Sequence, residues 1–289
     1  MKFGLRYANT GRYVRSGPAV ELSQAGEAAG FESIWTVEHV VVPSGYESAY
    51  PYSPDGKMAG GAEDLDLPDP LIWMAWVASA TTTIKVATGI LVLPQRNPVV
   101  TAKAVATLDA MSGGRVLLGV GVGWLREEFD TLGADFDERA AITDEYIAAL
   151  RALWTEGPSS FAGRFVSFDR VWCRPRPAQA HVPIIVGGHS KAAARRAGRI
   201  GDGFFPARGA PAELLEEVRR AAEEAGRDPD AVEITTSLPD DLDDIGDLAR
   251  RGVSRLLVPT SGMAGLQPRV GSLEDVAAFG EVIERYADL

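Results

Sequence analysis

The chain has 289 residues, 46% of them hydrophobic and 24% charged, so its length and composition suit one large α/β domain or two small ones. Its formal net charge of −11 argues against nucleic acid and anionic membranes as partners, because both would be repelled over the whole surface. The single cysteine, Cys173, excludes an internal disulfide and a thiolate zinc cluster, and the three histidines show no metal-ligand spacing. No signal peptide precedes Met1 and no apolar run approaches the roughly 20 residues of a membrane span, so we expect a cytoplasmic protein.

Buried strands are predicted where apolar and β-branched residues occupy both alternating faces, and helices where apolar residues return every three or four positions. In chain order this places strands at 3–7, 33–39, 84–94, 116–124, 183–188, 203–206, 233–237 and 255–259. Helices are predicted at 18–29, 70–80, 99–111, 138–155, from 190 onward, 213–225, 242–251 and 273–287, and a hairpin at 161–177 with Gly163 in its turn.

Eight strands, each followed by a helix, are typical of a closed (β/α)8 TIM barrel. We expect one such domain over residues 1–289, with long loops after the second and fourth strands, at 40–68 and 125–136. A doubly wound open sheet is the alternative fold, but no linker or change of composition divides the chain.

A series of glycines ends the fourth predicted strand. Gly119, Gly121 and Gly123 alternate with valines, so all three should project to the same face of that strand. A strip of backbone without side chains would result, and a flat ligand could lie against it. Gly121 and Gly123 are therefore candidate ligand contacts.

Five segments, in this order along the chain, carry a resemblance to a known family. They are EH at 38–39, ATGIL at 87–91, LDAMSGGR at 108–115, GVGVGW at 119–124 and IVGGHS at 185–190. Together they resemble the bacterial luciferase-like superfamily of flavin and deazaflavin oxidoreductases, and within it the branch that uses coenzyme F420. The barrel that this resemblance implies agrees with the alternation of strands and helices.

His39 is the candidate catalytic residue, because it ends its predicted strand and the carboxyl ends of barrel strands form the active-site face. The resemblance implies that this imidazole lies near the reactive ring of the cofactor and moves a proton to or from substrate. Alternatively, His39 only orders the loop after it. The resemblance also implies that Glu38 hydrogen-bonds the cofactor ring, where many relatives carry aspartate; a salt bridge within the loop is the other reading.

The segment containing Thr88, Gly89 and Ile90 matches the place where relatives have a non-proline cis peptide bond. The resemblance implies a bulge at Gly89 and Ile90 that bends the cofactor ring from behind, with all three residues contacting the cofactor. A strand glycine beside a close neighbour is the structural alternative.

A second glycine segment lies between a strand and a helix. Val186, Gly187, Gly188, His189 and Ser190 would bring bare backbone and a helix N-terminus to a cofactor phosphate. An anion could thus be held locally on an acidic protein. The start of a helix needs only Ser190 as its cap, so a purely structural role stays open.

The substrate pocket is expected around Trp124 and Glu127, which follow the glycine strip, and around Tyr46 in the first long loop. Tyr50 and Tyr52 of that loop are further candidate walls. Related sugar-phosphate dehydrogenases carry a glutamate near the position of Trp124. Its absence favours an apolar or aromatic substrate.

These readings predict an oxidoreductase that transfers a hydride between F420 and a small organic substrate. An FMN-dependent monooxygenase of the same superfamily is the first alternative, and a catalytically silent flavin-binding barrel is the second. The helices around Trp73 and Trp76 could form the interface of a homodimer, although packing between helix and barrel is the better explanation of both tryptophans.

Overall fold

The computed structural model describes residues 1–53, 55–58, 62–262 and 268–289. Its centre is a closed barrel in which neighbouring strands are parallel and β1 pairs with β11 while β3 pairs with β5. The eight barrel strands are β1 (Lys2–Arg6), β2 (Ser33–Thr36), β3 (Lys85–Thr88), β5 (Val116–Gly121), β8 (Ile184–Gly187), β9 (Gly203–Phe205), β10 (Glu233–Ser237) and β11 (Val253–Pro259). The predicted (β/α)8 fold is therefore confirmed.

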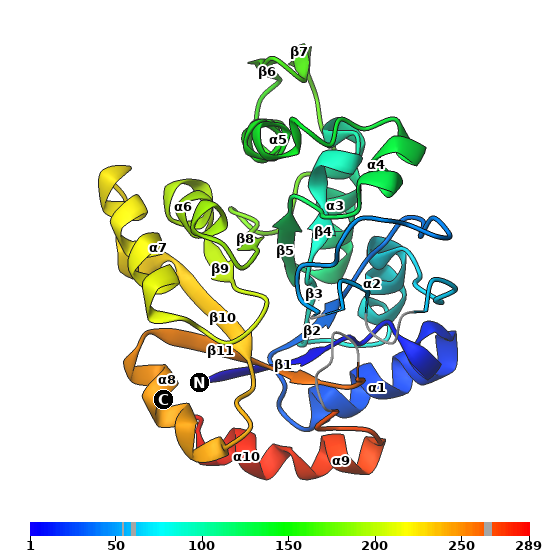
Figure 1. Ribbon diagram of the computed structural model, residues 1–289, viewed down its shortest axis with the longest axis vertical. Helices are drawn as coiled ribbons and strands as arrows, with labels where there is room; N and C mark the ends of the chain where they lie inside the picture. Colours follow the sequence, from blue (N-terminus) through cyan, green and yellow to red (C-terminus); the bar gives the residue numbers. More distant parts are fainter. Residues whose placement is uncertain (54, 59–61, 263–267) are drawn as a thin grey trace.

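Helices surround the barrel on its outside (Figure 1). They are α1 (Ser16–Ala28), α2 (Pro70–Ala78), α3 (Pro98–Ser112), α4 (Arg126–Leu132), α5 (Arg139–Leu153), α6 (Lys191–Ile200), α7 (Ala212–Glu224), α8 (Ile245–Arg250), α9 (Leu273–Ala278) and α10 (Gly280–Arg285). Local sequence sets their ends: Asn97 caps the first amides of α3, and Gly113 ends that helix with a left-handed φ of 72°. Among the described residues, no helix combines the length and hydropathy that crossing a bilayer requires.

Several predicted elements end or divide earlier than expected. The strand predicted at 84–94 is interrupted after β3 by a cis peptide bond between Gly89 and Ile90, and resumes as the short β4 (Leu91–Val92). β2 ends at Thr36, so residues 37–39 lie beyond the strand. The connection at 125–136 contains α4, the helix at 242–251 begins as a 3₁₀ turn, and the last helix is divided at Phe279.

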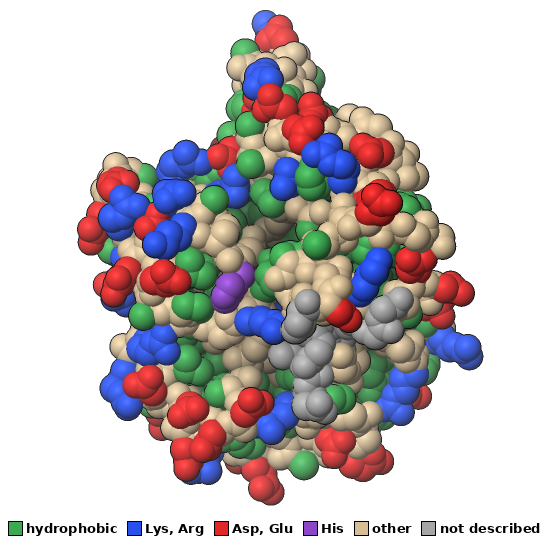
Figure 2. Space-filling model, in the orientation of Figure 1, with side chains coloured by type: hydrophobic (Ala, Val, Ile, Leu, Met, Phe, Trp, Pro, Cys, Tyr) green, Lys and Arg blue, Asp and Glu red, His purple; other side chains and the backbone are tan. Residues whose placement is uncertain are grey.

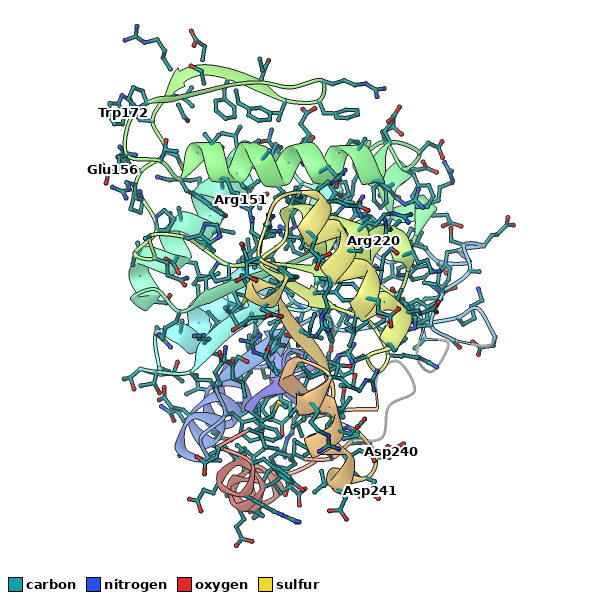
Figure 3. The ribbon with its side chains drawn as sticks, turned by 90° about the vertical axis from the view of Figure 1, so that its left-hand side faces the viewer. Arg151, Glu156, Trp172, Arg220, Asp240 and Asp241 are labelled. Atoms are coloured by element: carbon teal, nitrogen blue, oxygen red, sulfur yellow. The ribbon has the colours of Figure 1, made fainter. Side chains whose placement is uncertain are left out.

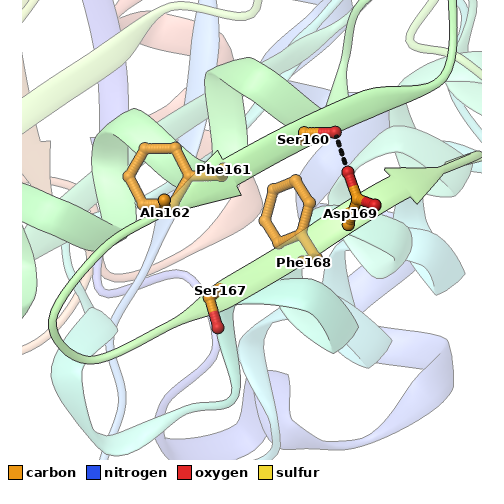
Figure 4. Close-up of a pocket in the computed structure, with 6 residues that line it drawn as sticks. All are labelled: Ser160, Phe161, Ala162, Ser167, Phe168 and Asp169. Carbon is orange, nitrogen blue, oxygen red and sulfur yellow. Dashed lines mark hydrogen bonds between the residues drawn. The ribbon is translucent and has the colours of Figure 1, made fainter.

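The predicted hairpin is present as β6 (Ser159–Ala162) and β7 (Ser167–Val171), and Gly163 begins its turn. It lies outside α5 (Figure 3), where the Glu145 carboxylate accepts hydrogen bonds from three amides of the turn at 2.7 to 2.8 Å. A shallow hollow on the hairpin is lined by the stacked rings of Phe161 and Phe168 (Figure 4). This hollow is separate from the barrel.

Two apolar layers stabilise the barrel. The larger core lies between strands and helices, and a smaller cluster fills the barrel interior with Trp35, Ala87, Leu117, Ile185, Phe205 and Leu257. On α2, Trp73 belongs to the core whereas Trp76 is 53% exposed. A homodimer formed through the exposed part of α2 stays a prediction.

Charged groups lie beside this interior layer. Arg255 is fully buried, its guanidinium donates to Glu32 at 3.0 and 3.1 Å, and it also donates to Glu233 at 3.1 Å. Burial acts to raise the pKa of Glu32, but Arg255 and Lys85 outweigh it and hold that pKa at about 2. By contrast, Asp240 and Asp241 point into solvent (Figure 3).

We predict that Arg255→Met lowers the free energy of unfolding by about 3 kcal/mol at pH 7, because two carboxylates lose a buried partner. Urea unfolding measures this difference. The Glu32 carboxylate has its ordinary pKa of 4.5 in the unfolded chain and about 2 in the folded one, so its stabilising contribution is complete above 4.5. It is lost as the pH falls toward 2. The difference between wild type and variant should shrink over that range, and a constant difference would contradict the assignment.

Candidate functional site

A cleft of about 730 Å³ opens at the carboxyl ends of the barrel strands. The face shown in Figure 2 is hollowed near its centre. The lining comes from segments that follow most of the strands in turn, including 6–7, 37–39, 89–92, 121–124, 187–190 and 205–208, together with residues of the first long loop. This is the face on which (β/α)8 barrels carry their active sites.

Most of the predicted site residues meet in this cleft. Those that line it are Glu38, His39, Gly89, Ile90, Gly121, Gly123, Trp124, Gly187, Gly188, His189 and Ser190. Tyr50 and Tyr52 also line it, and the ring of Tyr50 meets that of Trp124 edge-on at 5.0 Å.

Four predicted site residues are placed elsewhere. The hydroxyl of Thr88 is buried and donates to the carbonyl of Gly119 at 2.6 Å, and Val186 packs in the core between barrel and helices. Tyr46 is 2% exposed and lies behind Trp124, where its phenol oxygen accepts from the Met58 amide at 3.0 Å. For Val186, the alternation of side chains along β8 explains the position, since Ile185 faces the barrel interior and its neighbour must face outward.

Glu127 is the fourth of these residues. One of its oxygens, Oε1, accepts hydrogen bonds from the amides of Glu47 and Ser48 at 2.7 and 3.0 Å, so it anchors the first long loop. Its neighbour Glu128 lines the cleft instead. Successive residues of a helix point about 100° apart, so only one of the two glutamates can face the ligand. The sequence shows that the pair exists but not where α4 begins.

Glu128 is the partner of His39. The imidazole Nδ1 lies 2.9 Å from the carboxylate of Glu128, whose other oxygen accepts from the amide of Val40 at 2.6 Å. Burial acts to raise the pKa of Glu128, but His39 and the Val40 amide together hold it below its ordinary value. A carboxylate at Nδ1 makes that nitrogen the N–H donor, so Nε2 is the nitrogen available for proton transfer. Nε2 has no hydrogen-bond partner among the described residues.

We predict that Glu128→Gln weakens the His39 contact and lowers the free energy of unfolding by about 2 kcal/mol, whereas Glu127→Gln changes it far less. A glutamine at 127 can keep both hydrogen bonds through one oxygen, but at 128 its NH₂ must meet either the Val40 N–H or the His39 Nδ1–H. Nuclear magnetic resonance of nitrogen-labelled protein should show the low-field Nδ1–H signal in wild type and in Glu127→Gln. Its persistence unchanged in Glu128→Gln would refute the assignment.

Ile90 forms part of the cleft wall and packs on the interior layer of the barrel. A Cβ added at Gly121 would lie 2.6 Å from Ile90 Cδ1, and one added at Gly187 would lie 2.5 Å from Ile90 Cγ2. The expected strip of three free glycines is therefore corrected. Gly121 makes room for Ile90, while Gly123 lies beyond the strand with a φ of 79° beside Phe129.

We predict that Gly121→Ala lowers the free energy of unfolding by about 2 kcal/mol, because the added methyl group overlaps the Ile90 side chain. In an Ile90→Ala background the same change should have less than half that effect. Urea unfolding of the wild type, the two single variants and the double variant gives the coupling free energy between the two positions. Gly157→Ala, with no atom within 4 Å of the new methyl, serves as control. Equal effects in both backgrounds would show that Gly121 is not matched to Ile90.

Glu38 lines the cleft and is held there by protein partners. Its carboxylate accepts from the Val92 amide at 2.6 Å and forms an ion pair with Arg96, which also donates to Asp69 at 3.1 Å. Burial raises the pKa of Glu38, and Arg96 opposes that shift. Glu38 thus holds the chain just after the Gly89–Ile90 bond, and the loop salt bridge considered from the sequence is present.

The glycine segment after β8 leads into α6. The Ser190 hydroxyl accepts from the Ala193 amide at 3.2 Å, so this residue caps the helix, while Gly187, Gly188 and His189 line the cleft. Arg139 also lines the cleft, and its buried Nε has no hydrogen-bond partner among the described residues. The amide of Gly188 donates to the carbonyl of Phe205, so the first amides of α6 are the main-chain donors that suit this end of the helix to an anion.

A closed parallel barrel with one large cleft at its strand ends, and a paired histidine in that cleft, is the architecture of a (β/α)8 enzyme. Comparison with known proteins identifies the family. Residues 4–285 match the family model of the luciferase-like monooxygenases, and the chain belongs to that family.

The most similar proteins differ in what is known of them. Uncharacterised proteins of Mycobacterium bovis and Mycobacterium tuberculosis are 33% identical over 187 residues, which is 65% of this chain and 65% of theirs. An F420-dependent glucose-6-phosphate dehydrogenase of Amycolatopsis mediterranei is 31% identical over 278 residues, 93% of this chain and 76% of that protein. The resemblance to F420-dependent members of the family is therefore confirmed.

Solved structures agree on the fold. An F420-dependent secondary alcohol dehydrogenase in complex with an F420–acetone adduct superposes with a TM-score of 0.75 at 20% identity, covering 98% of both chains. The monooxygenase RslO1 from Streptomyces bottropensis superposes with a TM-score of 0.72 at 23% identity, covering 99% of this chain and 98% of that one. Both kinds of oxidoreductase thus share this barrel.

Proposed function

We propose that this protein is an F420-dependent oxidoreductase that transfers a hydride between the deazaflavin and a small organic substrate, with His39 as the proton donor or acceptor. The observation that carries the proposal is His39 itself, oriented through Nδ1 by Glu128 in a cleft at the strand ends. The relative from Amycolatopsis mediterranei supports F420 as the cofactor.

The residues of the cleft fit a cofactor with a flat ring and an anionic end. Ile90, seated between Gly121 and Gly187, offers an apolar surface for the ring. The first amides of α6, which follow Ser190, offer main-chain donors for a phosphate, and Arg139 also lines the cleft. When bound, F420 supplies the hydride chemistry at its carbon 5.

The protein's own contribution is to orient, to enclose and to move a proton. Glu128 holds the imidazole of His39 in one tautomer and one orientation, so Nε2 can accept a proton and return it. Trp124, Tyr50 and Tyr52 line the cleft with contacting aromatic rings and favour a substrate with an apolar or aromatic body.

We predict that the purified protein quenches F420 fluorescence with an affinity at least tenfold higher than that for FMN. His39→Gln should keep F420 affinity within threefold, because the side chain need not hold the cofactor, and should slow turnover by about 10² to 10⁴. F420 absorbance during a screen of alcohols, aldehydes and acids reports turnover. His181→Gln, which changes an exposed histidine paired with Asp202, is the control.

Three outcomes would change the proposal. Preference for FMN together with oxygen consumption would indicate a monooxygenase. Binding of F420 without any turnover, and indifference to His39→Gln, would indicate a catalytically silent barrel. Equal turnover in His39→Gln and wild type would remove His39 from the reaction while leaving the cofactor assignment intact.

A further inference from the structure

Arg6 is a buried cation at the end of β1. The residue is 7% exposed, lines the cleft, and lies between two aromatic rings, with its guanidinium carbon 4.6 Å from the centre of Tyr7 and 4.8 Å from that of Phe205. Its Nη1 donates to the Ser237 hydroxyl at 2.7 Å. Its buried Nε has no hydrogen-bond partner among the described residues.

The other buried arginines have their charge or their donors satisfied by the protein. Arg255 pairs with two glutamates, Arg196 pairs with Asp144, and Arg115 donates to four main-chain carbonyls and a hydroxyl. Arg6 forms no ion pair within the described part of the chain. The residues outside it, at 54, 59–61 and 263–267, include no aspartate or glutamate.

This arrangement is unfavourable in the free protein. An arginine cannot lose its proton to escape burial, and a buried charge without a counter-ion is a strongly destabilising feature. Stacking on Tyr7 and Phe205 offsets only part of that. The two acidic side chains of the cleft are engaged elsewhere, since Glu38 pairs with Arg96 and Glu128 with His39. An unpaired charge in a cleft is most simply explained by a ligand of opposite charge.

Arg6 and the expected phosphate site belong to strands on opposite sides of the barrel, since β1 is the first barrel strand and β8 the fifth of eight. The Arg6 guanidinium nevertheless reaches the ring of Phe205, the β9 residue that pairs with Gly187. A phosphate bound by the first amides of α6 would leave the planar donors of Arg6 for a second anionic group. Tyr50 and Tyr52 of the first long loop lie within reach of the Arg6 charge, which acts to lower their phenol pKa values against the larger effect of burial.

We infer that Arg6 binds a carboxylate of the substrate, so the protein acts on a small organic acid with an apolar or aromatic body. One unpaired guanidinium matches one negative charge, and its planar donors can hold both carboxylate oxygens. This inference rests on the proposed function only in calling the acid a substrate; the binding of an acid at Arg6 does not depend on which cofactor is used.

The test compares acids with their neutral amides, which have the same shape without the charge. Benzoate, 3-phenylpropionate and hexanoate, each beside its amide, are titrated into the apoprotein and into protein saturated with F420, and heat or tryptophan fluorescence reports binding. At least one acid should bind tenfold more tightly than its amide. Arg6→Gln should abolish that preference, because it weakens binding of the acid and leaves the affinity for the amide within twofold of the wild-type value. Arg12→Gln, which changes an exposed arginine outside the cleft, should keep it.

The inference would be overturned if the wild-type protein bound none of the three acids more tightly than its amide. This comparison does not require the Arg6→Gln variant to fold. Weakened F420 binding in Arg6→Gln with unchanged acid binding would also overturn it, by assigning Arg6 to the cofactor. A preference for acids in a protein that binds neither F420 nor FMN would support the acid site while refuting the proposed oxidoreductase. Unliganded Arg6→Gln should melt no lower than wild type.

Discussion

Close packing of Ile90 against bare backbone is the contact on which the geometry of the cleft depends. The cis bond between Gly89 and Ile90 ends β3, and the Ile90 side chain then fills the space that side chains at Gly121 and Gly187 would occupy. Because the two glycines belong to β5 and β8, the contact involves three neighbouring barrel strands. Protein interiors are packed too tightly to absorb an extra methyl group there without movement.

Ion pairs around this contact fix the segments that carry the chemistry. Glu38 holds the amide of Val92 just beyond Ile90, and Glu128 holds both the His39 ring and the Val40 amide. The two carboxylates therefore anchor the beginning of the first long loop on both sides of His39. A buried carboxylate that accepts main-chain hydrogen bonds is rigid as well as charged, which suits a group that must orient a proton carrier.

The fold and part of the site could be predicted from the sequence, because both depend on periodicity and on motifs at strand ends. His39 and the glycines after β8 can be placed in this way, whereas the Gly89–Ile90 cis bond follows from the resemblance to the family. The direction of individual side chains could not be predicted, since it requires knowing to within one residue where a strand or helix begins. Val186 and Glu127 face away from the cleft for that reason, and Glu128, which faces it, was missed. Arg6 also went unnoticed, because the lack of a counter-ion is visible only in three dimensions.

The distribution of charge in the cleft has a consequence for how two ligands would share it. The protein carries a formal net charge of −11, yet Arg6 and Arg139 line the cleft, each with a buried Nε that has no hydrogen-bond partner among the described residues. The acidic side chains that line the cleft, Glu38 and Glu128, are already paired. Attraction of an anion must therefore be local. If both cofactor and substrate are anionic, their negative groups need separate donors, and the repulsion between them opposes binding in the wrong place. The neutral parts of the two molecules are then left to meet between these sites, in the cleft that His39 lines.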